Sequence, residues 1–202
     1  MLTGRRDGLY NIARGDLFMT VVNPHLKFNY HDYCLLPDDK RVELIGGDFY
    51  MVPSPSVIHQ RIAANIEDIL RDYVKGNHLG EVFYAPLDVV LTPYDVVQPD
   101  VMFVSGERGR IVTEANIQGP PDLLVEVLSP STGERDRTIK KKLYARSGVR
   151  ELWLVNAATQ VVEVFDLETG GETPPVVYRR SGKEPLTSKV LPGLTVDLNE
   201  VF

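Results

Sequence analysis

The amino-acid sequence predicts an α/β fold with a central mixed β-sheet, helices flanking the sheet and a C-terminal β extension. Short runs of β-branched and aliphatic residues are bounded by Gly, Pro, Ser and Asn, which is typical of strands. Between Ser54 and Tyr73, apolar residues recur at helical spacing. The order of the segments is hairpin, helix, three strands, helix and strands, and this order favours helices packed on a mixed sheet.

The first half of the chain is expected to form a hairpin and a long helix. Residues 29–37 predict a short helical or turn segment, and residues 41–52 predict a hairpin closed by Gly46-Gly47. Ser54-Pro55-Ser56 supplies capping residues for the helix, whose apolar positions recur over residues 58–73. Glycines downstream of this stretch are expected to end the helix.

The second half is expected to supply most of the sheet and one more helix. That helix is predicted from a capping box at Ser131-Thr132-Gly133-Glu134 to a stop at Gly148. A long polar loop is expected at residues 105–121. Strands are predicted at residues 81–91, 97–104, 123–128, 151–156, 161–166 and 176–179. The last three of these form the C-terminal region of the sheet.

The composition is that of one globular domain. The chain has 202 residues, of which 43% are hydrophobic and 25% are charged, which is enough to bury a sizeable core. We assign residues 23–202 to a single domain. Residues 1–22 are expected to be either disordered or a mis-called N-terminal extension, because Met19 offers a second start and the residues before it show no sustained period.

Charge and cysteine content exclude several classes of protein. The formal net charge of −6 argues against a protein that coats nucleic acid, although a nuclease can offset its charge locally with metal ions and basic residues. The single cysteine, Cys34, rules out an intrachain disulfide and fits a cytoplasmic location. No apolar run reaches the roughly 20 residues of a membrane span, and the four histidines lack zinc spacing.

Two acidic residues are informative because each interrupts an apolar strand. Asp100 follows Pro99 in the predicted strand 97–104, and Glu126 lies in the predicted strand 123–128. A buried carboxylate costs several kcal/mol unless it is paired or holds a cation. If the two strands are neighbours in register, the acids meet, and their repulsion calls for a cation such as Mg²⁺ or Mn²⁺. The sequence therefore predicts a metal site at Asp100 and Glu126.

The second predicted helix offers a cation for the same site. Lys140 and Tyr144 are four residues apart and share one helix face. A lysine from the first turns of this helix could orient a water molecule or stabilise negative charge on a phosphate beside Glu126. The alternative is a solvated basic face, because Lys140, Lys141 and Lys142 are consecutive and cannot all point inward.

Three further polar residues are candidate supporting residues. His59 and Gln60 lie at the start of the first long helix and could reach the site, although a histidine there more often makes local polar contacts. Asp88 interrupts an apolar run and is a third acid, for which solvation at an edge strand is an equally good explanation. Trp153 lies among Leu and Val and predicts a core or dimer-interface position rather than a base-stacking surface.

These residues resemble the PD-(D/E)XK nuclease superfamily and, within it, the bacterial family Uma-two, whose members are described as restriction endonucleases. The resemblance spans roughly residues 30–202 and depends on the order and spacing of short motifs. The motifs are Val42-Glu43-Leu44-Ile45-Gly46-Gly47, Pro53-Ser54-Pro55 with His59-Gln60, Pro99-Asp100, Pro121-Asp122-Leu123-Leu124-Val125-Glu126-Val127-Leu128-Ser129-Pro130-Ser131, residues 136–140 with Tyr144, Gly148-Val149, Glu151-Leu152-Trp153 and Leu191-Pro192-Gly193-Leu194.

The resemblance implies a restriction-endonuclease-like core, a magnesium-dependent phosphodiesterase site and a homodimer. By the same resemblance, Asp100 and Glu126 look like the metal-binding pair. Glu43 looks like an additional acid near such sites, and exposure on a strand before the Gly-Gly turn is its other explanation. The superfamily motif has lysine two residues after the second acid, where this chain has Leu128. The resemblance implies that Lys140 supplies this lysine instead.

The leading hypothesis is metal-dependent hydrolysis of phosphodiester bonds in nucleic acid, with DNA as the expected substrate. Mg²⁺ or Mn²⁺ would bind Asp100 and Glu126, and Glu43 would assist. Lys140 would position water or stabilise charge, and Tyr144 would support Lys140. The alternative is a catalytically inactive binding or regulatory module with the nuclease fold, which Leu128 and the acidic net charge favour. A hydrolase of another phosphoester is a third class, since a fold does not determine its substrate.

Overall fold

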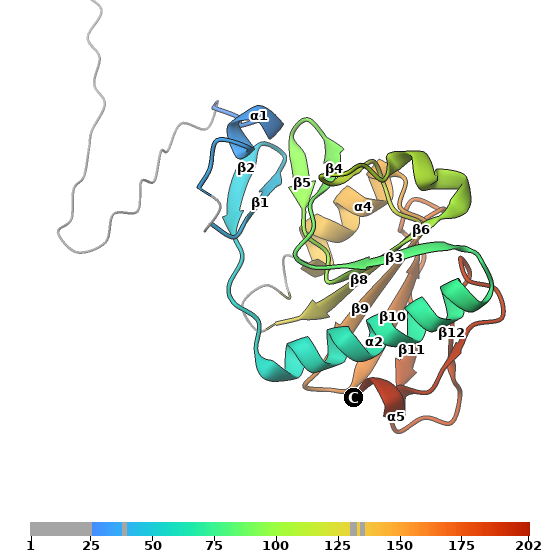
Figure 1. The fold of residues 1–202 in the computed structure, drawn as a ribbon. Helices are drawn as coiled ribbons and strands as arrows, with labels where there is room; N and C mark the ends of the chain where they lie inside the picture. Colours follow the sequence, from blue (N-terminus) through green and yellow to red (C-terminus); the bar gives the residue numbers. More distant parts are fainter. Residues whose placement is uncertain (1–25, 38–39, 130–132, 134–135) are drawn as a thin grey trace, which may run out of the picture.

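The computed structural model describes residues 26–37, 40–129, 133 and 136–202. Its strands form a five-stranded, a six-stranded and a two-stranded sheet (Figure 1), so the predicted mixed α/β fold is confirmed. The extension expected at residues 1–22 and the capping residues Ser131, Thr132 and Glu134 lie outside the described residues. Within the part of the chain that is described, no helix combines the length and apolar character needed to span a bilayer.

The five-stranded sheet is built on the N-terminal hairpin. At the hairpin turn, Gly46 and Gly47 have φ angles of 58° and 80°, a left-handed conformation that glycine adopts readily, and the predicted turn is confirmed. The short helix α1 (Tyr30–Tyr33) lies beside this sheet (Figure 1). The sheet has the order β2-β1-β5-β4-β7, with β1 (Val42–Ile45), β2 (Asp48–Met51), β4 (Val89–Thr92), β5 (Asp95–Val97) and β7 (Ile117–Gln118).

The six-stranded sheet has the order β11-β10-β9-β8-β6-β3. Neighbouring strands are antiparallel except β8 and β9, which are parallel. A parallel pair needs a crossover connection, and helix α4 (Lys141–Ser147) lies in the chain between these two strands. The six strands are β3 (Gly80–Tyr84), β6 (Val101–Ser105), β8 (Leu123–Leu128), β9 (Glu151–Asn156), β10 (Val161–Asp166) and β11 (Val176–Arg179).

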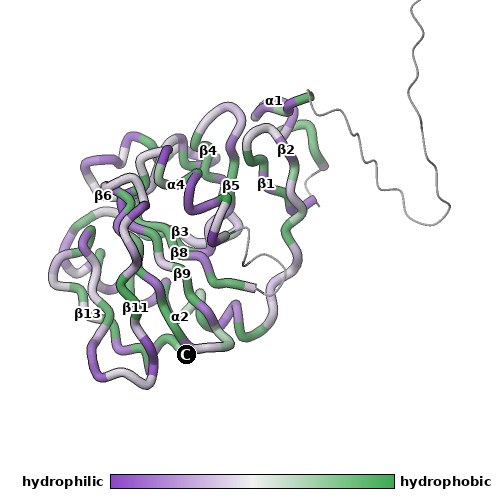
Figure 2. Tube along the Cα trace, turned by 180° about the vertical axis from the view of Figure 1, so that it is seen from behind, coloured by the Kyte–Doolittle hydropathy of each residue, from purple (hydrophilic) through white to green (hydrophobic). Residues whose placement is uncertain are grey.

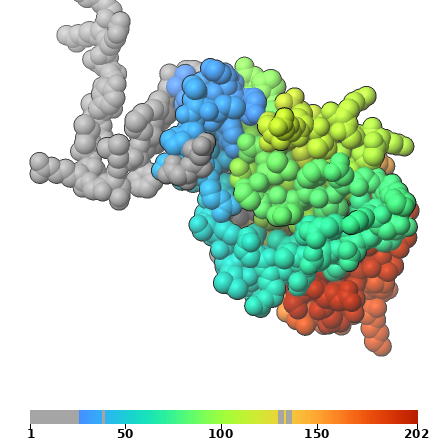
Figure 3. Space-filling view, in the orientation of Figure 1, coloured from blue at the N-terminus to red at the C-terminus, as the bar shows by residue number. Residues whose placement is uncertain are grey.

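Helices cover both faces of the six-stranded sheet. α2 (Val57–Gly76) is capped by Ser56, as predicted, and its apolar stripe packs on one face. α4 packs on the opposite face through Leu143 and Tyr144. It ends at Gly148, the predicted stop, which has a φ of 91°. Figure 2 shows hydrophobic residues along the central strands, and Figure 3 shows α2 forming one surface with the C-terminal residues.

Two predicted strands are each divided between the two sheets, which corrects the sequence-based expectation. Residues 81–91 contribute to β3 in the larger sheet and then to β4 in the smaller one. Residues 97–104 pass in the opposite direction, from β5 in the smaller sheet to β6 in the larger one. Pro86 and Pro99 lie at the two breaks, and proline has no N–H with which to continue a ladder. Asp100 therefore lies just before β6, in the segment that joins the sheets.

The loop expected at residues 105–121 contains short regular elements. A 3₁₀ helix, η1 (Gly106–Ile111), follows β6 directly, and β7 pairs in parallel with β4 in the smaller sheet. The sequence predicts a loop here because the segment is polar and shows no apolar period. Short 3₁₀ turns and two-residue strands need little periodicity, so the sequence pattern does not reveal them.

The predicted C-terminal β extension is confirmed. It consists of β11 at the edge of the larger sheet, a two-stranded sheet of β12 (Leu186–Thr187) and β13 (Thr195–Val196), and α5 (Leu198–Val201). The buried carboxylate of Glu151 ties it to the core, since it accepts hydrogen bonds from the backbone N–H of Lys189 and the indole N–H of Trp153, both at 2.7 Å. Trp153 is buried inside the core, which decides between its two predicted positions.

Candidate active site

The strands that carry Asp100 and Glu126 to the site, β6 and β8, are neighbours, so the condition for the two acids to approach each other is met. β6 and β8 are antiparallel with Val101 opposite Val125, and this register, continued by one residue, puts Asp100 opposite Glu126. Asp100 Oδ2 accepts a hydrogen bond of 2.7 Å from the backbone N–H of Val127. The two acidic side chains are 17% and 6% exposed, so both carboxylates are largely removed from bulk water.

Lys140 lies between two carboxylates. Its Nζ is 3.1 and 3.2 Å from the two carboxylate oxygens of Glu126 and 2.8 Å from Oε1 of Glu43. The lysine side chain is 5% exposed whereas Lys142 is exposed, so a solvated face does not describe Lys140. A π-helical turn, η2 (Asp136–Lys140), leads into α4 and ends at this lysine, and such turns are frequent at functional sites.

Helix α4 holds Glu126 and is itself tied to the smaller sheet. The Tyr144 hydroxyl donates a hydrogen bond of 2.5 Å to Glu126 Oε1. Tyr144 follows Lys140 by one helical turn, so the predicted shared face is confirmed. Arg146 Nη2 lies 3.2 Å from Oδ1 of the buried Asp95 on β5. Helix α4 therefore holds Glu126 of the larger sheet, while Arg146 anchors the helix to Asp95 of the smaller sheet.

Glu43 brings the smaller sheet into the site. It lies on β1 and is 1% exposed, so the explanation that it is an exposed strand residue is wrong. Its Oε1 accepts a hydrogen bond of 3.1 Å from the backbone N–H of Gln98, and the same oxygen contacts Lys140. Because Glu43 and Glu126 belong to different sheets, the ammonium of Lys140 joins the two sheets at this point.

Asp88 lies behind the site in a supporting cluster formed by Tyr33, Asp88 and Gln98. Gln98 Nε2 and the Tyr33 hydroxyl both donate to Asp88 Oδ1 at 2.8 Å, so Asp88 is not an edge residue stabilised by solvent alone. Burial and the negative charge of Asp88 raise the pKa of Tyr33, which keeps this hydroxyl protonated and donating at neutral pH. Gln98 in turn holds Glu43 through its backbone N–H.

Neither Tyr33 nor Gln98 stands out in the sequence. Gln98 lies two residues before Asp100, in the segment that joins β5 to β6, and this position is the signal that could have identified it. Tyr33 lies far from the acids along the chain and has no comparable signal. Its role in the cluster depends on how α1 packs beside the smaller sheet, which only the tertiary structure determines.

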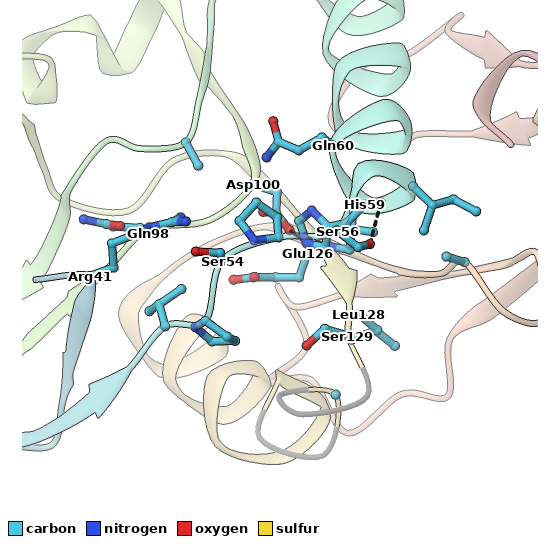
Figure 4. A pocket seen from close by; sticks show the side chains of 18 of the residues that line it. Arg41, Ser54, Ser56, His59, Gln60, Gln98, Asp100, Glu126, Leu128 and Ser129 are labelled. Carbon is cyan, nitrogen blue, oxygen red and sulfur yellow. Dashed lines mark hydrogen bonds and ion pairs between the residues drawn. The ribbon is translucent and has the colours of Figure 1, made fainter. Parts of the chain in front are cut away.

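The first turn of α2 supplies His59 and Gln60. His59 Nε2 lies 3.3 Å from Asp100 Oδ2. The Ser56 hydroxyl oxygen accepts a hydrogen bond of 3.2 Å from the His59 amide and thereby fixes the helix start from which this side chain projects. Gln60 lines the cavity in front of the acids (Figure 4). The structure therefore brings His59 to one of the two acids, and it places Gln60 on the wall of the same cavity.

A cavity of about 960 Å³ opens in front of these groups (Figure 4). Its wall comes from the end of the hairpin, the first turn of α2, the end of β8 and the turn after β9. Arg41 and Arg137 also line it, and isolated arginines carry no sequence pattern that would have identified them. Arg137 is paired with Glu163 on β10. The predicted site residues that line the cavity are Glu43, His59, Gln60, Asp100, Glu126 and Lys140.

The donor set fits a hard divalent cation. Asp100 and Glu126 present carboxylate oxygens to the same cavity, and Mg²⁺ or Mn²⁺ commonly binds one or two carboxylates and completes its shell with water and substrate oxygens. Among the described residues, no group of three or more His, Cys, Asp and Glu side chains is arranged to hold a metal ion. Asp100 and Glu126, with water completing the shell, are the residues that would hold such an ion.

A sheet that places two acids on adjoining strands, with a lysine against one of them, has the architecture of a restriction-endonuclease-like domain. A crystal structure described as that of "a putative nuclease belonging to DUF820", from Anabaena variabilis, shares this fold. The TM-score is 0.73 at 18% sequence identity, and the match covers 87% of this chain and 97% of that one.

The sequence model of the family described as "Uma2: Putative restriction endonuclease" matches residues 29–199. The chain belongs to this family, and the resemblance inferred from the motifs is confirmed. An uncharacterized protein of Synechocystis is 26% identical over 148 residues, which are 72% of this chain and 76% of that protein.

Proposed function

We propose that the protein is a metal-dependent endonuclease that hydrolyses phosphodiester bonds of nucleic acid, with DNA as the preferred substrate. The observation that carries the proposal is the position of the Lys140 ammonium between Glu43 and Glu126, with Asp100 beside them on one cavity. Membership of the family described as "Putative restriction endonuclease" supports the same reaction class. Acids and a buried lysine at one cavity are the groups that phosphodiester hydrolysis uses.

In this proposal each side chain has a defined task, and Glu126 has two. Asp100 and Glu126 hold Mg²⁺ or Mn²⁺, which when bound lowers the pKa of water and offsets charge on a phosphate oxygen. Lys140 stabilises the negative charge that develops on phosphorus-bound oxygens as water adds and an ester oxygen leaves. Glu43 and Glu126 orient the Lys140 ammonium, because both carboxylates contact it. Tyr144 holds Glu126 through its hydroxyl.

The experiment is a cleavage assay on DNA with Mg²⁺ or Mn²⁺, with chelator, and with Asp100→Asn. Wild type should cleave only with metal. Asparagine can still accept the Val127 hydrogen bond but loses the charge, so Asp100→Asn should lower the rate at least about a hundredfold. Asp72→Asn makes the same change at an exposed position on α2 and should leave the rate unchanged. Cleavage that persists in chelator would remove metal dependence from the proposal.

A non-catalytic binding or regulatory module is the second candidate. Leu128 favours it, because an apolar side chain lines the cavity where the superfamily motif has its lysine. The same assay separates the two candidates. A folded wild-type protein that binds oligonucleotides but leaves them intact with either metal is the result that selects the binding module.

We propose further that the protein acts in the cytoplasm as a homodimer. The single Cys34 is consistent with a reducing compartment. At the edge of the larger sheet, β11 exposes Val176 and Val177, which are 57% and 43% exposed. An exposed apolar edge strand is a surface that a second copy can cover.

Asp88→Leu is expected to reduce kcat about tenfold with little change in KM. The Gln98 amide then loses its acceptor, and the segment that positions Glu43 and Asp100 loosens. Asp88→Asn should keep most of the activity, because its side-chain oxygen can still accept from Gln98 and Tyr33. The measurement is initial cleavage rate against substrate concentration.

The matched control for this supporting cluster is a pair of tyrosine variants. Tyr33→Phe removes a hydroxyl that donates to Asp88 and should lower kcat, whereas Tyr94→Phe at an exposed position should not.

Equal losses in Asp88→Asn and Asp88→Leu would show that the charge of Asp88, and not its hydrogen bonds, is what the site needs.

A further inference from the structure

We infer that the cavity admits an unpaired nucleic-acid strand and that intact duplex is a poor substrate. The inference rests on the proposed nuclease function and specifies its substrate. Three properties of the described residues carry it: the depth of the reactive groups, the balance of charge around them, and an exposed apolar side chain on the cavity wall.

The reactive groups lie deep. Lys140 and Glu126 have side chains that are 5% and 6% exposed, and Asp100 is the most accessible of the acids at 17%. A phosphate must enter the cavity to reach them. Duplex DNA is stiff over roughly 150 base pairs, and each of its phosphates is flanked by a paired, stacked helix that cannot follow it inward. A flexible unpaired strand can bend one phosphate into a cavity of about 960 Å³.

Charge around the cavity is balanced. Among the described residues that line it, and leaving His59 aside, the cationic side chains are Arg41, Arg137 and Lys140. The carboxylates match these in number: Glu43, Asp100 and Glu126. Arg137 is in addition paired with Glu163. Proteins that grip duplex DNA neutralise many phosphates with a positive surface. The cavity can neutralise only a few, which suits contact with a short stretch of one strand.

Ile58 presents apolar surface where such a strand would pass. It lies in the first turn of α2, lines the cavity and is 54% exposed. Pro53 and Pro55 line the cavity next to it. The base faces of an unpaired strand are apolar and exposed, whereas stacking hides them in a duplex. No Phe, Tyr or Trp occurs among the described lining residues, so strong stacking and a marked base preference are not expected.

The test compares one labelled sequence as unpaired DNA, as unpaired RNA and as duplex DNA, with Mg²⁺ or Mn²⁺. Unpaired DNA should be cleaved at least about tenfold faster than duplex in kcat/KM. Unpaired RNA cleaved at a comparable rate would extend the substrate class to both nucleic acids. Duplex cleaved as fast as the unpaired strand overturns the inference and leaves the proposed nuclease function standing.

The matched variants are Ile58→Glu and Val57→Glu. Both place a carboxylate in the first turn of α2 at an exposed position, and only Ile58 is among the cavity-lining residues. Ile58→Glu should weaken cleavage of the unpaired strand about tenfold through charge repulsion, while Val57→Glu should behave as wild type. Equal effects of the two substitutions would count against a strand path over Ile58.

Failure of the nuclease proposal remains distinguishable from failure of this inference. If no substrate is cleaved with either metal, the proposed function fails, and binding of the same labelled oligonucleotides to the wild-type protein decides the inference. Tighter binding of unpaired DNA, weakened by Ile58→Glu only, supports it. Equal or tighter binding of duplex overturns it.

Discussion

Glu126→Gln is expected to abolish cleavage and to leave the protein folded. Glutamine keeps the shape of the side chain, and its oxygen can still accept the hydrogen bond from Tyr144. The substitution removes the negative charge that Lys140 contacts and that the proposed metal requires. The cleavage rate on unpaired DNA with Mg²⁺ or Mn²⁺ should therefore fall at least about a hundredfold.

Glu81→Gln provides the matched control. Glu81 is an exposed glutamate on β3, so the same change in shape and charge occurs there without contact to Lys140. It should leave the cleavage rate unchanged. Urea unfolding of both variants separates loss of function from loss of fold. Equal residual cleavage by wild type and Glu126→Gln would mean that a contaminating nuclease is being measured.

Lys140→Met should have the largest effect on stability. The ammonium lies between Glu43 and Glu126, and the three side chains are 5%, 1% and 6% exposed. Methionine retains the apolar stem but leaves two buried carboxylates facing each other without a cation. Removing one partner of a buried ion pair typically costs about 3–5 kcal/mol, and we expect a loss of this order in the free energy of unfolding. Cleavage should also fall at least about a hundredfold.

Lys142 and the metal ion provide two controls for the prediction on Lys140→Met. Lys142→Met changes an exposed lysine on the same helix and should alter the free energy of unfolding by less than about 0.5 kcal/mol. Because a divalent cation can replace the missing ammonium between carboxylates, Mn²⁺ should stabilise Lys140→Met more than wild type. Urea unfolding with and without Mn²⁺ measures both effects. A Lys140→Met protein as stable as wild type would show that the buried carboxylates do not depend on the lysine.

Local patterns were sufficient to predict most elements. The Gly46-Gly47 hairpin, helix α2 with its Ser56 cap, strand β8 and the stop of α4 at Gly148 all follow from residues that are close together in the chain. Helical spacing, capping and left-handed glycines are properties of neighbouring residues, so they are visible without the fold. Strands β9 and β10 were predicted for the same reason.

The divided strands show where local patterns were insufficient. An apolar run indicates that a strand is buried, but it does not indicate which sheet buries it. Residues 81–91 and 97–104 each pass from one sheet to the other, and Asp100 lies at one of these passages. The sheet to which each half belongs is decided by packing of the whole molecule, because both halves satisfy the same apolar pattern.

In the candidate site, too, some residues are indicated by the sequence and others only by the tertiary structure. The local setting of Asp100 and Glu126, two acids in apolar runs, indicates them from the chain alone. Lys140 was favoured over a solvated basic face by its spacing from Tyr144 and by the family resemblance, and its contact with Glu126 is observed. The resemblance also indicated Glu43, but its burial and its contact with Lys140 are decided only by tertiary structure. The supporting residues Gln98 and Tyr33 were not indicated by the sequence. These contacts join two sheets and a short helix, and the distance between such elements depends on how they pack rather than on their separation in the sequence.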